Sequence, residues 1–379
     1  KPMVFMVICL LILFYMFDKY YFGHELIPES NRNDESHKLG LEGSFNLLLL
    51  LGVIGGVLLS GLNSKIKIID CNKLHVKSCL FYLIKYFNVE KPDYFVSTLD
   101  YVNITVSLVH KLSRSKSKLL LWEHNTLSIH SKITISKYDF LNKILIKYFY
   151  SQAYRIVVVS KGIKDDLISK YNLSEKNINV IYNPVYNDSI IQSSNTKDKD
   201  TNVINIPYIV TVGRLVQQKN YFNLITAFKI LLESKTINNI NLVIIGEGKE
   251  KNNIIELINQ LKINNNVYLT GFLRNPFPII KNSIAVVLAS DYEGLPTILI
   301  EALSLKKQIV STDCPSGPRE ILDHGKYGLL VPVNNPEKLA EGIAQIIKGK
   351  VKFDEELLLQ RAKYFNIEKS FNQFMEVIN

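Results

Sequence analysis

The sequence lacks the features of a metal-stabilised or disulfide-rich protein. Its 379 residues include four cysteines, none of which forms a Cys-x-x-Cys pair or stands at metal-ligand spacing from a histidine. The four are Cys9, Cys71, Cys79 and Cys314. We therefore expect reduced, mostly buried thiols in a cytoplasmic protein.

Charge of one sign is not concentrated at any point of the chain. The formal net charge is +10, but no block of five or six like charges occurs, and most of the excess is lysine scattered among Asn and Ile. This distribution argues against nucleic acid as a partner. Anionic ligands such as nucleotides, and anionic membrane surfaces, stay as candidates.

No apolar run reaches the roughly 20 residues that a membrane-spanning helix prefers. Residues 2–17 are an unbroken apolar run with charged residues at both ends, and residues 47–62 form a second run that three glycines interrupt. The first run fits either a membrane anchor or a buried strand and helix of an α/β core. We expect a cytoplasmic protein, and both a peripheral position and an anchored one at the cytoplasmic face of a membrane remain open.

From residue 65 onward, short β-rich runs alternate with amphipathic helical patterns, as in a doubly wound sheet. We expect strands at residues 65–70, 94–98, 118–122, 155–160 and 178–181, with helices at 79–87, 138–150 and 163–171. A polar segment without periodicity follows at residues 187–206, and we interpret it as an interdomain linker.

A second alternation of the same kind begins at residue 208. Strands are expected at residues 208–212, 241–245, 267–270, 284–288 and 308–311, with helices at 221–233, 251–262, 297–304 and through 336–379. The sequence thus predicts an α/β protein with two Rossmann-like doubly wound domains. Because open α/β sheets bind ligands at the carboxyl ends of their strands, the cleft between the domains is the expected site.

The predicted domain limits follow from these patterns. An N-terminal domain with an atypical first βα unit covers residues 1–186, and a second domain covers residues 207–365 beyond the linker. Residues 366–379 are expected to form a C-terminal helix that packs back on the N-terminal domain.

Glycine-containing turns follow several of the predicted strands. Gly213 leads into Arg214 and Lys219, two cations that precede a helix start and suit either a diphosphate or an ordinary solvated turn. Gly246-Glu247-Gly248 is not a complete Gly-x-Gly-x-x-Gly fingerprint and favours a tight strand-to-helix turn. In Ser316-Gly317-Pro318, a tight turn precedes a helix start that would either receive an anion or only be well capped.

Two glutamates stand eight positions apart near the end of the strand at residues 284–288. Glu293 falls on the loop after that strand, and Glu301 falls about one turn into the helix that begins after Pro296. The pattern permits two unrelated charges or two carboxylates that bind one ligand. A buried carboxylate at either place would need hydroxyl or amide donors as partners.

Taken in order, these motifs resemble the retaining GT-B glycosyltransferases of family 4, also called glycosyltransferase group 1. The resemblance is carried by Gly213-Arg214 with Lys219-Asn220, Gly246-Glu247-Gly248, Glu293-x7-Glu301 and Ser316-Gly317-Pro318-Arg319-Glu320-Ile321-Leu322. It covers about residues 65–365 and is best from residue 208 onward. It implies a GT-B fold, in which two Rossmann-like domains face each other across a cleft.

The resemblance also implies an activity. Such an enzyme is a hexosyl- or N-acetylhexosaminyl-transferase that moves a sugar from a nucleotide-diphosphate donor, here expected to be a UDP-sugar, with retention of configuration. The acceptor would be a hydroxyl of a glycan or of a lipid-linked acceptor in surface polysaccharide or glycoconjugate synthesis. No obligatory metal or other cofactor is expected, because a basic pair replaces it.

The resemblance further assigns roles to matching residues. Arg214 and Lys219 would clamp the donor diphosphate and offset the charge that develops on the leaving group. Glu293 would bind hydroxyls of the donor sugar rather than act as a nucleophile, although two carboxylates also suggest a hydrolase. Glu301 would accept hydrogen bonds from the ribose, and His124 of Glu123-His124-Asn125 would contact the donor sugar or the acceptor. The other donor-binding positions are Gly213, Gly246, Gly294, Leu295, Pro296 and Gly317, while Ser160 and Asn183-Pro184 match family segments that are either structural or face the cleft.

The N-terminal part departs from the family pattern. Gly23-His24-Glu25-Leu26 matches the family, but the glycine turn expected before it is missing. Two alternatives therefore stay open beside the active enzyme. One is a degenerate, non-catalytic GT-B protein that binds nucleotide, and the other is a membrane-anchored variant of the enzyme.

Overall fold

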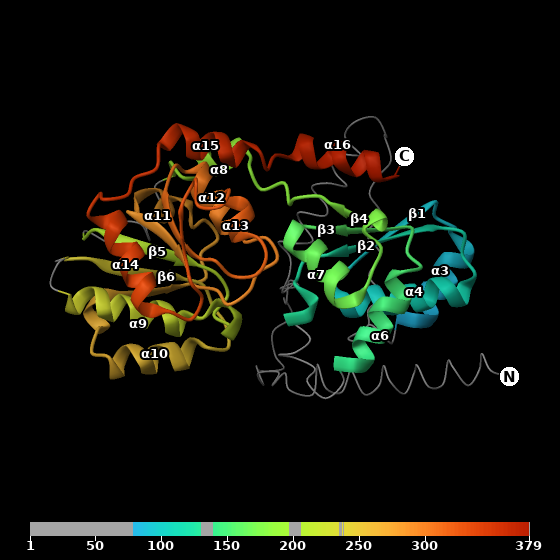
Figure 1. The fold of residues 1–379 in the computed structure, drawn as a ribbon, viewed down its shortest axis with the longest axis horizontal. Helices are drawn as coiled ribbons and strands as arrows, with labels where there is room; N and C mark the ends of the chain where they lie inside the picture. The colour runs from blue at the N-terminus through green and yellow to red at the C-terminus, as the bar shows by residue number, and fades with distance from the viewer. Residues whose placement is uncertain (1–78, 130–138, 197–205, 235–236, 238, 379) are drawn as a thin grey trace, which may run out of the picture. The chain divides into compact units, whose positions relative to one another are not determined.

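The computed structural model describes residues 79–129, 139–196, 206–234, 237 and 239–378 (Figure 1). The apolar runs at 2–17 and 47–62, the strand expected at 65–70, and the segment around Gly23 lie outside the described residues. Cys79 and Cys314 are free thiols, as expected. None of the described helices combines the length and apolar character needed to cross a membrane.

The chain divides into two compact units, each of which is described by itself. Of the described residues, the first unit contains 79–123, 127–129, 139–157 and 166–179. The second contains residues 124–126, 158–165 and 180 onward. The predicted limits of the linker and of the two domains, and the predicted packing of the C-terminal helix on the N-terminal domain, stay predictions.

The sheet of the first unit has the order β1-β2-β3-β4. Its strands are β1 (Tyr94–Thr98), β2 (Lys118–Glu123), β3 (Arg155–Val158) and β4 (Ile178–Val180). β1 and β2 are parallel, with Tyr94 opposite Lys118. β2 is buried from Leu119 to Glu123, which explains why it reads as a continuous apolar run.

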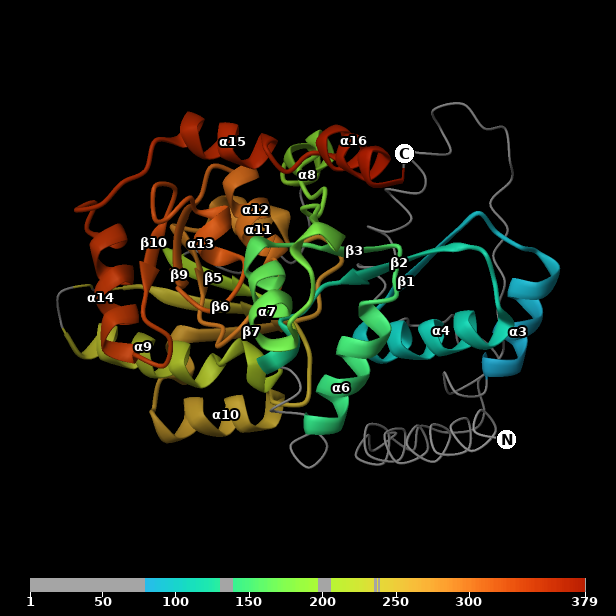
Figure 2. The same ribbon diagram turned by 45° about the vertical axis from the view of Figure 1, so that its right-hand side comes forward.

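Helices α3 (Leu80–Val89), α4 (Asp100–Ser113), α6 (Asp139–Tyr150) and α7 (Lys161–Tyr171) complete this part of the fold. α4 packs against both α3 and α6. Figures 1 and 2 show these three helices as one layer on the same face of the sheet. α4 was not predicted, because residues 103–109 are all buried and leave no amphipathic period to detect.

The sheet of the second unit has the order β10-β9-β8-β5-β6-β7, and each neighbouring pair is parallel. Its strands are β5 (Tyr208–Val212), β6 (Asn241–Ile245), β7 (Val267–Gly271), β8 (Ala285–Leu288), β9 (Gln308–Thr312) and β10 (Leu329–Val331). The chain leaves β5 in one direction through β6 and β7, then returns to the other side of β5 with β8. The predicted doubly wound sheet is therefore confirmed, with its topological switch point between β5 and β8.

Helices cover both faces of this second sheet (Figures 1 and 2). One layer consists of α9 (Tyr221–Glu233), α10 (Lys251–Gln260) and α14 (Pro336–Ile347). The other consists of α11 (Phe277–Asn282), α12 (Thr297–Ser304), α13 (Pro318–Ile321) and α15 (Glu355–Lys363), and α16 (Ile367–Ile378) ends the chain. The core between α9, α14 and the sheet is apolar, with Leu224, Phe228 and Ile343 fully buried.

Three short elements were not foreseen. α8 (Asp188–Ser193) begins the segment expected to be a linker without structure, where Asn187 accepts a hydrogen bond from the Ser189 amide at 2.9 Å and Ile190 is buried. α11 and β10 were also missed. Elements of six and three residues are too short to display a hydrophobic period.

Candidate functional site

The candidate site is built where β5 and β8 lie side by side. Because all six strands are parallel, their carboxyl ends share one edge of the sheet, and the loops after β5 and β8 adjoin at the switch point. Lys219 ends the loop after β5, and its Nζ lies 2.6 Å from Oε1 of Glu293 in the loop after β8. The structure thus brings together two residues that the sequence placed at the site.

Glu293 is held from several directions. Its Oε1 also accepts a hydrogen bond from Ser290 Oγ at 2.6 Å, and its side chain is 8% exposed. Among the described residues, no hydrogen bond reaches Oε2. Its backbone amide donates to the Pro315 carbonyl at 3.1 Å, and its carbonyl accepts from Thr126 Oγ1 at 2.9 Å. The protein therefore fixes the carboxylate through one of its two oxygens.

Gly294 allows this loop to approach the segment after β2. A Cβ built on Gly294 would lie 1.7 Å from the carbonyl oxygen of His124, so any larger residue would collide with the backbone. Thr126 fastens the same segment, because its hydroxyl also pairs with Ser316 Oγ at 2.9 Å. The predicted residues His124 and Gly294 are thus in direct contact.

His124 and its neighbour Glu123 both sit in surroundings that disfavour charge. Burial lowers the pKa of His124 to about 4, so the imidazole is neutral at pH 7. Glu123 is 1% exposed and belongs to the first unit, where burial raises its pKa to about 8. Its Oε1 accepts hydrogen bonds from Asn103 Nδ2 at 2.7 Å and from Tyr150 Oη. This buried network anchors the strand end from which His124 follows.

Glu301 lies on α12, which begins at Thr297 after Pro296. Its carboxyl is buried, and burial raises its pKa to about 7, an effect that a hydrogen bond with Thr297 opposes. A ligand that donates hydroxyl groups to Glu301 would replace the lost solvation and favour the ionised form. Leu295 and Pro296, also predicted to bind the donor, are buried in the loop between the two glutamates.

Arg214 is exposed in the loop after β5, next to Gly213. The glycine turn after β6 packs directly on this loop: Gly246 has a φ of +148°, and a Cβ there would lie 2.0 Å from the Gly213 carbonyl oxygen. The Leu215 amide donates to the Glu247 carbonyl at 2.8 Å. This close backbone packing confirms the predicted tight strand-to-helix turn. It also explains why residue 246 is a glycine without reference to any ligand.

Gly317 precedes α13 as its N-cap residue, as the sequence predicted, but α13 spans four residues only. The carboxylate of Glu320 instead caps another helix. It accepts hydrogen bonds from the Lys161 and Gly162 amides, both at 2.8 Å, and from Tyr182 Oη at 3.1 Å. The negative charge therefore lies at the N-terminus of α7, where the helix dipole stabilises it.

Sequence reasoning had matched Ser160 and Asn183 to family segments. Ser160 is fully buried, and its hydroxyl accepts a hydrogen bond from the Ile163 amide at 3.3 Å in the first turn of α7. Asn183 is buried too. Both residues are thus held inside the protein, in positions that suit a structural role. No pattern in the sequence indicated the contacts of Thr126 or the capping role of Glu320, because their partners are more than 150 positions away in the chain. Ser290 was missed although its partner Glu293 is only three positions away.

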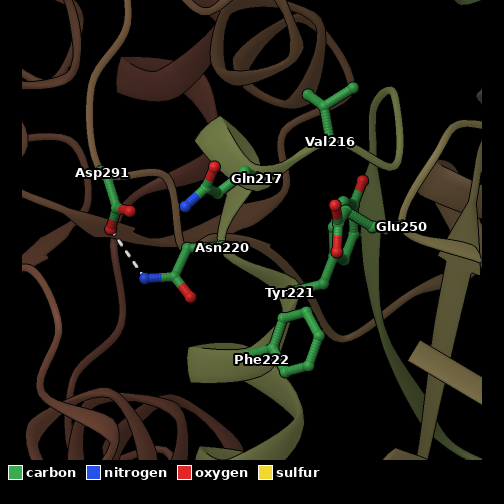
Figure 3. Close-up of a pocket in the computed structure, with 7 residues that line it drawn as sticks. All are labelled: Val216, Gln217, Asn220, Tyr221, Phe222, Glu250 and Asp291. Carbon is green, nitrogen blue, oxygen red and sulfur yellow. Dashed lines mark hydrogen bonds between the residues drawn. The ribbon is translucent and has the colours of Figure 1, made fainter. Parts of the chain in front are cut away.

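A pocket of about 440 Å³ lies at the turn between β5 and α9 (Figure 3). It is lined by Val216, Gln217, Asn220, Tyr221, Phe222, Glu250 and Asp291. Asn220 Nδ2 donates to Asp291 Oδ1 at 2.7 Å, which links the turn before α9 to the loop after β8. None of the residues predicted to bind the donor lines this pocket. Within the described part of the chain, no group of three or more His, Cys, Asp or Glu side chains is placed to hold a metal ion.

The two α/β units, the second of which is doubly wound, match solved structures of the GT-B class of glycosyltransferases. Anabaena Alr3699/HepE in complex with UDP-glucose matches with a TM-score of 0.70 and 16% identity over 91% of this chain and 97% of that one. The apo form of the lipopolysaccharide outer core galactosyltransferase WaaB matches with a TM-score of 0.63 and 23% identity, over 82% and 81% of the two chains. The predicted GT-B fold is confirmed.

Family comparisons identify the chain more narrowly. The model for glycosyl transferases group 1 matches residues 193–364, and that for glycosyltransferase family 4 matches residues 63–188. An uncharacterised glycosyltransferase of Methanocaldococcus jannaschii is 32% identical over 343 residues, 78% of this chain and 81% of the relative. The chain belongs to the group 1 glycosyltransferases of family 4. A third model, for citrate transport, matches residues 1–86, most of which lie outside the described residues.

The name of a further relative states the reaction that this relative catalyses. The N-acetylgalactosamine-N,N'-diacetylbacillosaminyl-diphospho-undecaprenol 4-alpha-N-acetylgalactosaminyltransferase of Campylobacter jejuni is 32% identical over 244 residues. That match covers 64% of this chain and 64% of the relative. The amylovoran biosynthesis glycosyltransferase AmsD of Erwinia amylovora is 27% identical over 249 residues, 65% of this chain and 66% of the relative.

Proposed function

We propose that the chain is a retaining glycosyltransferase that transfers a hexosyl or N-acetylhexosaminyl group from a UDP-sugar to a hydroxyl of a glycan or lipid-linked acceptor. The observation that carries the proposal is the Lys219–Glu293–Ser290 arrangement at the switch point between β5 and β8. It joins a cation suited to a diphosphate and a carboxylate suited to sugar hydroxyls.

In this proposal, Lys219 and Arg214 compensate the negative charge that develops on the leaving group. When the bond between the sugar and the diphosphate breaks, negative charge grows on the departing UDP. Two cations in the loop after β5 stabilise that charge, which is the role a metal ion plays in other transferases. No obligatory metal or other cofactor is part of this proposal.

Glu293 positions the sugar. Because Lys219 and Ser290 occupy Oε1, the carboxylate plane is fixed and Oε2 can accept a hydrogen bond from a sugar hydroxyl. The Gly294 and Leu295 amides follow it in the same loop, and neutral His124 touches that loop from the other side. Gly213, Pro296 and Gly317 shape the backbone around the donor. The donor diphosphate itself serves as the base toward the acceptor hydroxyl, so Glu293 is not a nucleophile.

Glu301 binds the ribose. Its buried carboxyl gains two hydroxyl donors when the nucleotide enters, which offsets the desolvation that raises its pKa. The choice of UDP follows the relatives of the fold, since HepE is a complex with UDP-glucose.

The acceptor class and the location follow the relatives by sequence. The Campylobacter jejuni relative acts on a diphospho-undecaprenol-linked sugar, and the Erwinia amylovora relative serves amylovoran biosynthesis. We infer surface polysaccharide or glycoconjugate synthesis at the cytoplasmic face of a membrane, where an anionic membrane surface is a partner and nucleic acid is not. The non-catalytic alternative rests on the atypical first βα unit, which lies outside the described residues.

The test uses purified full-length chain and a panel of UDP- and GDP-sugars, with and without a lipid extract as acceptor. Release of UDP that depends on one donor and is stimulated by the extract is expected. If UDP binds by calorimetry but no donor is turned over under either condition, the chain is a non-catalytic nucleotide-binding protein and the proposal is wrong.

A further inference from the structure

The pocket at the turn between β5 and α9 has no role in the proposed reaction, since none of its lining residues is assigned to the donor. Its volume of about 440 Å³ lies within the range of small-molecule sites, about 300–1,000 Å³. The lining comes from three places in the second unit: the loop after β5 with the start of α9, the N-cap of α10, and the loop after β8. The pocket thus has the size and the construction of a ligand site.

Asn220 fixes the polar side of the pocket. Its Nδ2 donates to Asp291 Oδ1 at 2.7 Å and to Asn334 Oδ1 at 2.6 Å, and its Oδ1 accepts from the Asn223 amide at 3.1 Å. Its φ of +44° is a conformation that asparagine tolerates better than most residues. The Asp291 amide also donates to the Gln218 carbonyl at 2.9 Å. The pocket is therefore already formed in the free chain, which lowers the cost of ordering it around a ligand.

Three polar groups of the lining can still bind a ligand. Among the described residues, no hydrogen bond reaches Asp291 Oδ2 or Glu250 Oε1, whereas Asn220 and Asn253 bind the other oxygen of each carboxylate. The side-chain amide of Gln217 makes no hydrogen bond to any described residue either. Burial raises the pKa of Asp291, so this carboxylate is partly desolvated and gains from a hydroxyl donor. The pocket thus offers two acceptors and one amide that both donates and accepts.

Phe222 adds an exposed aromatic ring to the same pocket. Its side chain is 40% exposed in the first turn of α9, next to the buried Tyr221. Tyr221 forms a fixed wall, because its Oη donates to the Gly213 carbonyl at 2.9 Å. Figure 3 shows the two rings on one side of the pocket and the polar ends of Gln217 and Asp291 on the other. A ligand in this pocket therefore meets an apolar surface and hydrogen-bonding groups together.

This combination excludes several classes of ligand. Asp291 and Glu250 are the charged residues of the lining, so a phosphate or another anion is repelled. Within the described part of the chain, no group of three or more His, Cys, Asp or Glu side chains is placed to hold a metal ion. An ammonium group only donates, so it leaves the Gln217 amide nitrogen without an acceptor. A hydroxylated ring with an apolar face suits all these groups, because each hydroxyl both donates and accepts.

We propose that this pocket binds a neutral hexopyranose unit of a glycan chain, outside the donor site. The ring of Phe222 packs on the C–H face of the sugar, as aromatic rings pack on other apolar surfaces. Asp291 Oδ2 and Glu250 Oε1 accept hydrogen bonds from sugar hydroxyls, and the Gln217 amide bridges two further oxygens of the sugar.

This inference deepens the proposed function and rests on it in one respect, because the glycan is taken to be the acceptor chain. Asn220 follows Lys219 directly, and Asp291 stands two positions before Glu293, so the bound unit lies beside the loops of the candidate site. An acceptor of several units then gains affinity from a second point of attachment. Binding of a free sugar does not require turnover, so the two proposals can fail separately.

The first test measures the binding of free sugars to the purified full-length chain. The panel consists of the methyl glycosides of glucose, galactose, mannose, N-acetylglucosamine and N-acetylgalactosamine, each titrated by saturation-transfer NMR. For at least one of them we expect a dissociation constant on the order of 1 mM, as suits so small a ligand. The uronic acid that corresponds to the best sugar should bind about tenfold more weakly, because its charge faces two carboxylates. Absence of binding by every neutral sugar overturns the proposal.

Variants then assign the binding to the pocket. Phe222→Ala should weaken it about fivefold to tenfold, whereas Phe222→Tyr keeps the ring and should retain it. Gln217→Ala should weaken it about threefold to tenfold. The matched control is Ile255→Ala on α10, since Ile255 is 39% exposed and does not line the pocket. Binding that survives Phe222→Ala and Gln217→Ala but is lost in Glu293→Gln belongs to the donor site and overturns the proposal.

The second test compares a single-unit acceptor with the same acceptor extended by neutral hexoses, using the donor that the chain turns over. The extended acceptor should have the lower KM, and Phe222→Ala should abolish this difference while Ile255→Ala preserves it. A preference for the extended acceptor that is the same in Phe222→Ala and in the wild type contradicts the proposal. If no donor is turned over, the proposed function fails, and the sugar titration alone decides whether the pocket binds a hexopyranose.

Discussion

The two carboxylate oxygens of Glu293 have different surroundings, and this difference fits the proposed role of a residue that binds a sugar hydroxyl without acting as a nucleophile. Lys219 and Ser290 both bind Oε1, at 2.6 Å each. A carboxylate whose charge is matched by an ammonium is a poor nucleophile but a good hydrogen-bond acceptor for a hydroxyl group. Lys219 fixes Glu293 in the structure, and in the proposed function it also compensates the charge of the diphosphate.

Lys219→Ala should lower kcat/KM for the donor by about a hundredfold to a thousandfold, because the leaving UDP loses a compensating charge. The control is Lys229→Ala, which removes a lysine that pairs with Glu233 at 3.2 Å on the surface of α9. Adding Glu293→Gln to Lys219→Ala should restore thermal stability, since it removes the buried unpaired charge, but not turnover. Turnover close to wild type in Lys219→Ala would contradict the assignment.

Glu301 predicts a pH dependence of nucleotide binding. Its pKa in the free protein is raised to about 7 by burial, and ribose hydroxyls favour its ionised form. Below pH 7 the nucleotide must displace a proton, so affinity for UDP should rise up to about tenfold per pH unit between pH 5 and 7 and level off above pH 8. Calorimetry at several pH values measures this, and Glu301→Gln should bind weakly with a flat profile. An unchanged slope in Glu301→Gln would mean that another group titrates.

The Glu301 carboxyl also makes the stability of the folded chain depend on pH. Its folded pKa lies above the unfolded value, so ionisation is penalised in the folded chain. The penalty is absent below about pH 4.5 and complete above about pH 7. Relative to wild type, Glu301→Gln should therefore be more stable at pH 8 than at pH 5.

At the scale of elements, three loops meet around Gly294, where there is no room for a side chain, and Thr126, whose hydroxyl joins the other two loops to its own. The loop after β8 rests on the segment after β2 at Gly294, and Thr126 ties that segment to the turn before α13. These contacts hold His124 and Glu293 within one assembly. The geometry of the site thus depends on backbone approach as much as on the side chains that perform the chemistry.

Gly294→Ala should cost about 1–3 kcal/mol of stability and reduce turnover strongly, because its Cβ would lie 1.7 Å from the His124 carbonyl oxygen. Gly349→Ala is the comparison. Its φ of +65° makes alanine strained, but a Cβ there meets nothing within 4 Å, so it should cost only about 1 kcal/mol and leave turnover intact. Equal costs and equal activities would show that the contact at Gly294 is unimportant. Denaturant unfolding and donor turnover provide the two readouts.

Glu320→Gln should weaken the start of α7. The carboxylate accepts two backbone hydrogen bonds there, so replacing its charge should cost about 0.5–2 kcal/mol, seen as a fall in Tm. Glu341→Gln removes a carboxylate from an exposed pair with Lys338 on α14 and should change Tm little. Identical melting of the two variants would argue against the capping role.

Helices and strands with a clear hydrophobic period in the sequence could be predicted, and those without one could not. β5, β6 and α9 were expected at their observed bounds, because each is a long enough run with a regular pattern. α4 was missed because burial on all sides hides the period. The Glu293–Lys219 pair could be suspected from motif order, but the Glu320 cap could not, since its partners are 158 and 159 positions away in the chain.

At the scale of the whole molecule, each unit contributes a different property. The second unit carries the Lys219–Glu293 pair, Glu301 and the glycine turns, to which the proposed function assigns the binding and activation of a nucleotide sugar. The described part of the first unit carries the buried network of Glu123, Asn103 and Tyr150, which anchors the end of β2. Family membership and the GT-B fold fit the first property. The net charge of +10 is compatible with an anionic ligand such as a nucleotide.

The most direct test of the account is the configuration of the transferred sugar. Purified full-length chain is incubated with the UDP-sugar it turns over and an acceptor, and the new glycosidic bond is analysed by proton NMR. The account predicts release of UDP and a product with the same anomeric configuration as the donor, with both reduced about a hundredfold or more in Lys219→Ala. An inverted product, or UDP binding without any transferred sugar, would contradict it.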